Sequence, residues 1–159
     1  MTNAKIIEKT KEIVSTIFGY LGVEAEVKVE ITEDKGRKIV KIDATGENNL
    51  GRLIGFHGKN LEALQLIIQI LLVKNCEESV TVALDVNGYR EKRELSLKNL
   101  AYRIAEQVKK TGKPYELPPL PPAERRIIHI TLSEDKDVKT ESTGEGEARR
   151  VVIKPVNSA

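Results

Sequence analysis

The sequence predicts an α+β protein made of two small domains, and three observations carry this prediction. Within residues 1–88, the spacing of apolar residues indicates the order helix, strand, strand, short helix, glycine loop, long helix and strand. Residues 89–155 show a second long helix, a proline-rich link, a shorter helix and two strands. A turn signal at Asn87–Gly88, followed by a charged run, marks the boundary between the two halves. Helices and strands that are each apolar on one side indicate two-layer packing in both halves.

The first half is expected to begin with a helix and a β-hairpin. Ile6, Val14 and Phe18 belong to an apolar row at helical spacing that predicts a helix over residues 3–20. Two stretches then alternate apolar and charged residues, which is typical of half-buried strands joined by a tight turn. The two strands are expected at 25–32 and 37–44, with the turn at 33–36.

A glycine loop is expected to separate two further helices. Asn48 or Asn49 is suited to cap a short helix before the loop. The long helix over residues 59–74 has a broad apolar face, which we expect to be mostly buried. The pattern suits three strands covered on one side by three helices. The residues that widen the apolar face are Ile67 and Ile70, and the third strand is expected at 79–86.

The second half is expected to begin with a long helix over 89–111 that Gly112 ends. Prolines dominate the following link, 114–125, and favour an extended chain with a short edge strand. Pro122 is suited to the first turn of a helix that runs to about Leu132. The remaining expected elements are strands at 136–143 and 149–154 and a tail at 156–159.

Composition limits the function classes. Hydrophobic residues make up 40% of the 159 positions and charged residues 31%, which is enough apolar material for a core. No apolar run reaches the ~20 residues of a membrane helix, and charges interrupt the apolar positions of the N-terminus, unlike in a secretory signal. One cysteine, Cys76, and two distant histidines make a disulfide and a zinc site implausible, so we expect no metal and no cofactor. Residues 1–88 carry a net charge of −2 and residues 89–159 one of +4, and the latter is compatible with nucleic acid.

The segment GFHG, residues 55–58, is the first candidate site. Its two glycines widen the backbone's choice of conformation and leave its surface bare. The loop also delivers the N-terminus of the long helix, where free N–H groups and the helix dipole favour a phosphate. Lys59 adds a charge, Asn60 adds a donor, and Arg52 lies on the preceding short helix. The alternative is a tight joint between two helices, which a bare pair of glycines also favours.

The second candidate site lies in the segment ERRIIHITL. Arg125 and His129 are four residues apart and therefore share one face of the expected helix, with Arg126 beside them. An arginine and a histidine on one exposed face can bind a phosphate. The alternative, which spacing alone favours, is that Arg125 pairs with Glu124 or Glu116 and that His129 is a half-buried structural residue.

The element order and the segment LIGFHGKNLEALQLIIQILL resemble the KH domain in its bacterial type II arrangement. In that family the GxxG loop clamps about four nucleotides of single-stranded RNA or DNA. The resemblance implies a clamp made of Gly55, Phe56, His57 and Gly58, with Lys59 behind it. The inner positions of such loops usually include Lys or Arg, so Phe56 and His57 give this loop less positive charge. Phe56 either stacks on a base or packs inward, and the sequence favours neither.

The second half resembles the single-stranded nucleic-acid-binding domain named R-3-H, which has a long helix, a proline-rich link, an RxxxH helix and a terminal hairpin. Its Arg/His pair matches Arg125 and His129. The stretches LDVNGYREKRELSLKNLAYRIAEQVKKTG, ERRIIHITL and GEGEARRVVIKP closely resemble the bacterial Jag family, the SpoIIIJ-associated proteins also called KhpB. The resemblance implies a type II KH domain over 1–88 and an R-3-H domain over 89–155. Further arginines expected to extend the second contact are Arg90, Arg93, Arg149 and Arg150.

The resemblance implies a non-catalytic protein that binds single-stranded RNA, or single-stranded DNA, and regulates expression after transcription in the bacterial cytoplasm. It also implies a small KH-only protein as a partner. Many members carry an extra N-terminal domain, and this chain begins directly with the KH helix, so we expect it to lack that domain. The alternative is a protein-interaction adaptor with weakened nucleic-acid binding, which the uncharged GFHG favours. An enzyme is disfavoured, because neither histidine has a recognisable carboxylate or nucleophile partner in the sequence.

Overall fold

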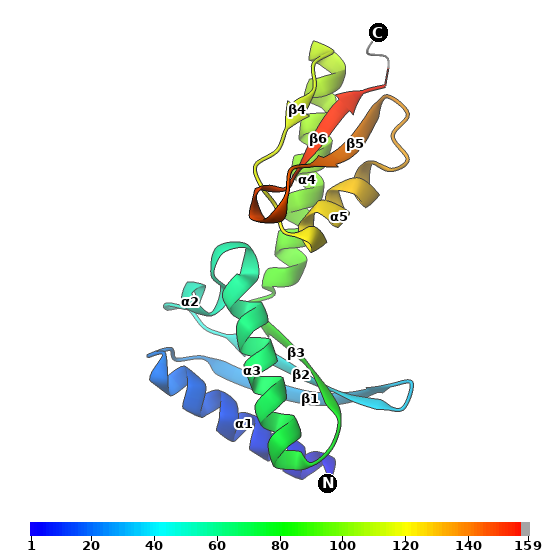
Figure 1. Cartoon of the computed structure of the whole chain (residues 1–159). Helices are drawn as coiled ribbons and strands as arrows, with labels where there is room; N and C mark the ends of the chain where they lie inside the picture. Colours follow the sequence, from blue (N-terminus) through cyan, green and yellow to red (C-terminus); the bar gives the residue numbers. More distant parts are fainter. Residues whose placement is uncertain (157–159) are drawn as a thin grey trace. The chain divides into compact units, whose positions relative to one another are not determined.

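The computed structural model describes residues 1–156 and divides the chain into two compact units, Met1–Tyr89 and Arg90–Ala159. Each unit consists of helices packed on a three-stranded sheet, so the α+β prediction is confirmed (Figure 1). Each unit also has a hydrophobic core of its own. The two units are therefore described separately.

The first unit follows the predicted order of elements. Its sheet has the order β1-β2-β3, in which β1 and β2 are antiparallel and β2 and β3 are parallel. The long helices α1 and α3 contact each other and lie on one face of the sheet (Figure 1). The elements are α1 (Asn3–Tyr20), β1 (Glu26–Asp34), β2 (Arg37–Thr45), α2 (Gly51–Ile54), η1 (Phe56–Gly58), α3 (Lys59–Cys76) and β3 (Val80–Val86).

Alternating side chains of the strands build the core of this unit. Val40 and Ile42 of β2 and Val82 and Leu84 of β3 are buried beneath α1 and α3. The hairpin between β1 and β2 is tighter than the turn predicted at 33–36, because the strands pair as far as their last residues, Asp34 and Arg37. The two residues between them, Lys35 and Gly36, both have positive φ, which is the signature of a type I′ turn.

The short helix α2 begins differently from the prediction. Leu50 occupies the N-cap position, and no side chain caps the helix. The prediction that Asn48 or Asn49 caps it is therefore wrong. Asn49 instead adopts a left-handed conformation with φ 61°, and its backbone carbonyl accepts a hydrogen bond from Arg52 N at 3.3 Å. The backbone carbonyl of Asn49, rather than an asparagine side chain, therefore accepts a hydrogen bond from an amide of the first turn of α2.

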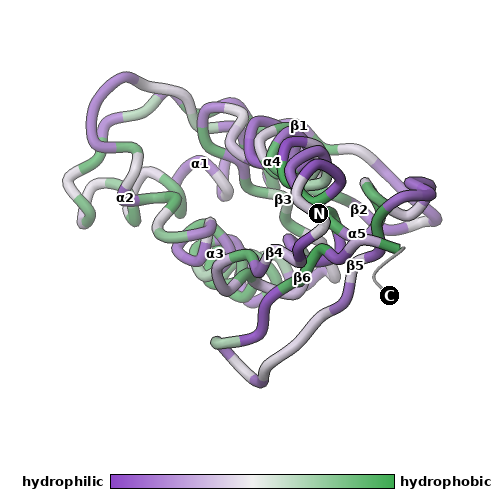
Figure 2. Tube along the Cα trace, turned by 90° about the horizontal axis from the view of Figure 1, so that it is seen from above, coloured by the Kyte–Doolittle hydropathy of each residue, from purple (hydrophilic) through white to green (hydrophobic). Residues whose placement is uncertain are grey.

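The apolar face of α3 is also less buried than expected. Leu61, Ile68 and Leu72 are fully buried, but Ile67 is 48% exposed and Ile70 57%. Only one side of α3 packs on the sheet and α1, so a face as broad as the sequence suggests cannot all be covered. Figure 2 shows hydrophobic and hydrophilic residues mixed along the turns of this helix. The exposed apolar residues of α3, called here the α3 apolar face, are Leu66, Ile67, Ile70 and Val73.

Two glutamines of α3 cover the backbone of β3 at the edge of the sheet. Gln69 Oε1 accepts a hydrogen bond from Val82 N, and Gln65 Oε1 accepts one from Leu84 N, both at 3.0 Å. A spacing of four residues on the helix matches a spacing of two on the strand, so both glutamines reach the same row of amides. β3 pairs with β2 on its other side, and the glutamines therefore occupy donors that a further strand would need.

The second unit packs two helices on a sheet of order β4-β6-β5, in which both pairings are antiparallel. Leu97, Ala101 and Val108 of the long helix pack with Ile128 and Ile153 in the core. The predicted edge strand and the helix that begins at Pro122 are both present. The elements are α4 (Tyr89–Thr111), β4 (Tyr115–Glu116), α5 (Pro122–Leu132), β5 (Val138–Thr143), η2 (Gly146–Ala148) and β6 (Arg150–Pro155).

The predicted tail at 156–159 lies largely outside the described residues. Its first residue, Val156, donates its backbone N–H to Asp137 O at 2.9 Å, so it continues the ordered chain. Among residues 1–156, no helix is long and apolar enough to cross a membrane.

Candidate nucleic-acid interface

The loop at residues 55–58 is shaped by backbone conformations that favour glycine. Gly55 has φ 71° and ψ −176°, and Gly58 is left-handed with φ 74° and ψ 15°. His57 between them is also left-handed, with φ 55°. The chain therefore reverses sharply between α2 and α3, and α3 begins immediately after the loop at Lys59.

Close packing explains why a side chain fits at neither glycine. A Cβ atom on Gly55 would lie 2.5 Å from Cγ of Asn60, and one on Gly58 would lie 3.0 Å from Cε1 of Tyr89. Asn60 is held in place because its Nδ2 donates to the backbone oxygen of Arg52 at 2.9 Å. The Asn60 side chain, predicted as a donor to a ligand, thus ties the first turn of α3 to α2. The Tyr89 ring packs against Gly58 on the side where a Cβ atom would project.

The loop also uses some of its own amide groups. Gly58 N donates to Gly55 O at 3.3 Å, and the Lys59 N–H donates to Phe56 O. These two groups are therefore less available to a phosphate than the glycine pattern suggested.

Phe56 points outward, and its side chain is 76% exposed. Its ring contacts the His57 ring edge-on, with centroids 3.9 Å apart and an angle of 62°. The sequence left open whether Phe56 packs inward, and the structure answers that it does not. Arg52 and Lys59 are exposed on either side of the loop in sequence. The loop thus exposes an aromatic ring between two glycines, with an exposed cation four residues before Phe56 and another three residues after it.

The second candidate site is built on α5 and β5. Arg125 and His129 lie one turn apart on α5 and are both half-buried, and Arg126 is exposed. Nε of Arg125 donates to the backbone oxygen of Leu120 at 3.1 Å. Arg125 therefore pairs with neither Glu124 nor Glu116, and the interpretation that it does is wrong.

His129 is the centre of a small polar network. Its Nδ1 lies 2.6 Å from Oγ1 of Thr140, and its Nε2 lies 2.8 Å from Oγ of Ser142. Burial lowers the pKa of His129 from 6.5, and the positive charges of Arg125 and Arg149 lower it further. The imidazole is therefore neutral at neutral pH, and both of its nitrogens are bonded to hydroxyl groups of β5.

The four further arginines that were expected to extend the second contact have different surroundings. Arg93 forms a two-bonded ion pair with Glu124, with Nε 2.8 Å from Oε1 and Nη2 2.9 Å from Oε2. Arg150 Nε lies 3.4 Å from Oε1 of Glu116. Arg149 donates to Gly144 O at 2.8 Å and lies close enough to His129 to influence its pKa. Arg90 is exposed on the first turn of α4.

Comparison with known proteins finds a matching domain family for each half of the chain. A family profile described as the KH domain of KhpA/KhpB matches residues 11–84, and one described as the R-3-H domain matches residues 95–155. A relative from Bacillus subtilis (strain 168), named RNA-binding protein KhpB, is 39% identical over 154 residues, which cover 94% of this chain and 73% of the relative.

The chain belongs to the KhpB family.

The resemblance noted in the sequence is thereby confirmed. Further relatives of the same name come from Clostridium symbiosum, 36% identical over 146 residues, and from Lactiplantibacillus plantarum, 38% identical over 135 residues. These alignments cover 92% and 84% of this chain. The chain spans 64% of the length of the first of these KhpB proteins and 40% of the second.

Sequence reasoning missed several residues of the candidate interface. Thr140 and Ser142 are two apart on a strand, and this spacing could have shown that both hydroxyls face the same side. Tyr89 behind Gly58 and the partner of Glu124 could not have been found, because both contacts join segments far apart in the sequence. Among residues 1–156, no three His, Cys, Asp or Glu side chains are grouped so that they could hold a metal ion.

Proposed function

We propose that this KhpB-family chain is a non-catalytic protein that binds single-stranded RNA and regulates expression after transcription in the bacterial cytoplasm. A KH domain over residues 1–88 and an R-3-H domain over 89–155 would each contribute a contact. The relatives' shared name, RNA-binding protein KhpB, supports the proposal. The single observation that carries it is the exposed ring of Phe56 on the glycine loop, with the exposed cations Arg52 and Lys59 on either side of the loop in the sequence.

In the first contact, the strand's backbone approaches Gly55 and Gly58, where no side chain stands in the way. Arg52 and Lys59 neutralise its phosphates, and Phe56 stacks on a base. Stacking of this kind contributes about 1–3 kcal/mol per base and tolerates different bases. The exposed aromatic ring thus offsets the absence of Lys or Arg at the two inner positions of the loop.

In the second contact, Arg125, Arg126 and Arg149 supply the charge. His129 holds Thr140 and Ser142 in place rather than binding phosphate itself, because both of its ring nitrogens are already bonded. Each hydroxyl keeps capacity for a further hydrogen bond, so Thr140 and Ser142 can contact the strand. Two weak contacts in one chain raise the effective concentration of the second once the first has formed.

The test is titration of a fluorescein-labelled single-stranded RNA with the full chain at several salt concentrations. We expect the double variant Phe56→Asp/His57→Asp to lose most of the affinity, since it removes the stacking ring and adds negative charge next to the phosphates. Tyr20→Asp/Leu21→Asp is the matched control, because it also introduces two negative charges at adjacent exposed residues, of which Tyr20 is 89% exposed and Leu21 40%. Unchanged binding by the loop variant would refute the first contact. Single-stranded DNA should compete, because the proposed contacts do not involve the 2′-hydroxyl.

A second candidate function is a protein-interaction adaptor, and the α3 apolar face favours it. Four large apolar side chains, each at least 40% exposed, lie on one helix of the first unit. Such an exposed apolar surface is typical of a protein contact. One family profile describes the KH domains of KhpA and KhpB together, so a KH-only protein of this family is the partner we propose.

This candidate is tested by measuring molar mass in solution for the chain alone and mixed with a KH-only family member. Ile70→Asp places a charge in the middle of the α3 apolar face and should abolish a complex made there. Lys74→Asp is the control, because Lys74 is exposed on the last turn of the same helix. A complex that survives Ile70→Asp would refute this contact. Nucleic-acid binding should weaken steeply with salt, whereas an apolar protein contact should not.

A further inference from the structure

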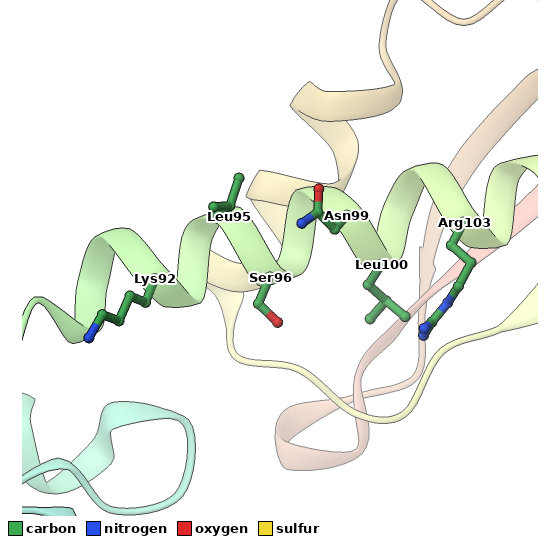
Figure 3. A pocket seen from close by; sticks show the side chains of 6 residues that line it. All are labelled: Lys92, Leu95, Ser96, Asn99, Leu100 and Arg103. Carbon is green, nitrogen blue, oxygen red and sulfur yellow. The ribbon is translucent and has the colours of Figure 1, made fainter.

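The long helix α4 carries an open groove that the two candidate contacts do not use. The groove has a volume of about 650 Å³ and is lined by six residues of α4 (Figure 3). In Figure 3, Lys92, Ser96, Leu100 and Arg103 project from one side of the helix, whereas Leu95 and Asn99 project from the other side in that view. We call these residues the α4 groove: Lys92, Leu95, Ser96, Asn99, Leu100 and Arg103.

The side chains of this region form two neighbouring rows. The first row is Lys92, Ser96, Leu100 and Arg103, in steps of four, four and three residues, which keeps them on one face of a helix. It has a cation at each end, and the two are roughly 16 Å apart along the helix axis at 1.5 Å per residue. The second row is Leu95, Asn99 and Tyr102.

The second row exposes two large apolar side chains. Leu95 is 59% exposed and Tyr102 56%, and Asn99 lies between them with both a donor and an acceptor. The bases of single strands stack on exposed aromatic side chains such as Tyr102, and an aliphatic side chain such as Leu95 adds apolar contact surface. The amide of Asn99 can bond a base edge.

The charges of α4 leave the cations of the groove available. The helix carries seven Lys or Arg residues and three Glu residues. Glu94 is paired with Lys98, and Glu106 with Lys109, so these carboxylates are engaged elsewhere on the helix. Among residues 1–156, neither Lys92 nor Arg103 forms an ion pair or a side-chain hydrogen bond.

We propose that the α4 groove is a further binding site for a single-stranded polynucleotide, whose phosphates lie along Lys92 and Arg103 and whose bases pack against Leu95 and Tyr102. The inference rests on the proposed function and adds a contact to it. A polyanion fits the two available cations, and bases fit the exposed row next to them. At 3.4 Å or more per nucleotide, the distance between the cations spans several phosphates.

The experiment compares charge-removing variants of the full chain in titrations with fluorescein-labelled single-stranded RNA. Lys92→Gln/Arg103→Gln removes two charges from the groove. Lys5→Gln/Lys110→Gln removes two charges from exposed cations outside it and is the matched control. Each phosphate interaction that is removed should reduce the slope of log K against log salt by about 0.7. We expect the groove variant to show a slope smaller by about 1.4 and an affinity about five- to twentyfold weaker, and the control to show neither change.

A second variant separates the two rows. Leu95→Ala/Tyr102→Ala removes apolar surface without changing charge, so it should lower affinity about fivefold or more and leave the salt slope unchanged. In the unsubstituted chain, addition of the same RNA should shift the NMR signals of the Asn99 side-chain amide. This measurement does not depend on any variant folding.

The possible outcomes distinguish a failure of the groove inference from a failure of the proposed RNA-binding function. If the unsubstituted chain binds RNA, the groove variants match the control and the Asn99 signals do not move, the groove inference is overturned and the proposed function stands. If the unsubstituted chain does not bind RNA at all, both fall. A selective loss in the groove variants together with a shift at Asn99 supports both.

Discussion

The ion pair between Arg93 and Glu124 allows a direct test of whether Arg93 stabilises the fold or contacts RNA. Glu124 is only 7% exposed, and both of its oxygens are bonded by the Arg93 guanidinium. Arg93→Met would keep most of the volume of the side chain but remove the guanidinium that bonds both oxygens of this buried carboxylate. Removing one partner of a buried pair costs about 3–5 kcal/mol. The Arg93 side chain is 29% exposed, so water can reach the site, and we expect about 2–3 kcal/mol.

A double-mutant cycle measures this cost and its cause. Arg93→Met should lower the melting temperature of the second unit by about 10–20 °C, since 1 kcal/mol corresponds to about 4–8 °C in a domain of this size. Glu124→Leu in the same chain removes the buried carboxylate that has lost the Arg93 guanidinium, so the double variant should regain most of the loss. Calorimetry gives the transition, and amide hydrogen exchange in α4 and α5 assigns it to the second unit.

Two results would refute this reasoning. One is a cost below about 0.5 kcal/mol for Arg93→Met, the value typical of an ordinary surface substitution. The other is a double variant that is no more stable than Arg93→Met. RNA titration of the double variant adds a functional test. If Arg93 acts only by holding Glu124, the affinity of that variant should be unchanged, and a selective loss would establish Arg93 as a direct contact.

Three further predictions follow from single contacts. Gly55→Ala should destabilise the first unit by about 1–3 kcal/mol in urea unfolding and weaken RNA binding, because its Cβ meets Asn60 at a positive φ. Gln69→Leu should cost about 1–3 kcal/mol and increase aggregation, measured by light scattering, because Val82 N loses its acceptor at the sheet edge. The pKa of His129 is lowered in the fold, so the unfolded chain binds more protons below about pH 6.5. The stability that wild type has over His129→Gln should therefore be constant above that pH and fall as pH drops below it.

Each of these has its own control or contrary outcome. Gly51→Ala has open space around its Cβ and should be tolerated, so equal costs at Gly51 and Gly55 would contradict the steric argument. Gln69→Glu keeps an acceptor oxygen and should aggregate less than Gln69→Leu. A stability difference between wild type and His129→Gln that does not change between pH 5 and 7.5 would contradict the lowered pKa of His129.

Most of the fold could be predicted from periodicity alone, because long helices and alternating strands repeat one local rule many times. The helix over 89–111 and the helix starting at Pro122 have the predicted bounds. The prediction was wrong where burial depends on what lies opposite. Ile67 and Ile70 look like core residues in the sequence, but the sheet and α1 cover only one side of α3. The number of neighbouring elements, rather than the residue's own hydrophobicity, decides how wide a buried face can be.

The sequence identified the segments that form the candidate sites, but it did not predict which groups their side chains contact. GFHG identifies a loop, yet the outward direction of Phe56 depends on backbone angles at Gly55 and His57 that no spacing reveals. Asn60 looks like a ligand donor in the sequence, but in the fold it bonds to Arg52 O. His129 lies on the predicted face of α5, but the two hydroxyl groups bonded to its ring nitrogens come from Thr140 and Ser142 of strand β5. Such partners are brought together only by tertiary packing.

The packing of Tyr89 against Gly58 affects where the chain can be divided into fragments for binding experiments. Tyr89 packs behind Gly58, yet it is also the first residue of α4, the helix that leads into the second unit. A fragment that stops at residue 88 would contain every residue of the GxxG motif and still lack the ring that backs it. Weak RNA binding by such a fragment would then measure a missing neighbour rather than the KH loop. A fragment that extends one or two helical turns past Tyr89 keeps the loop in its native surroundings.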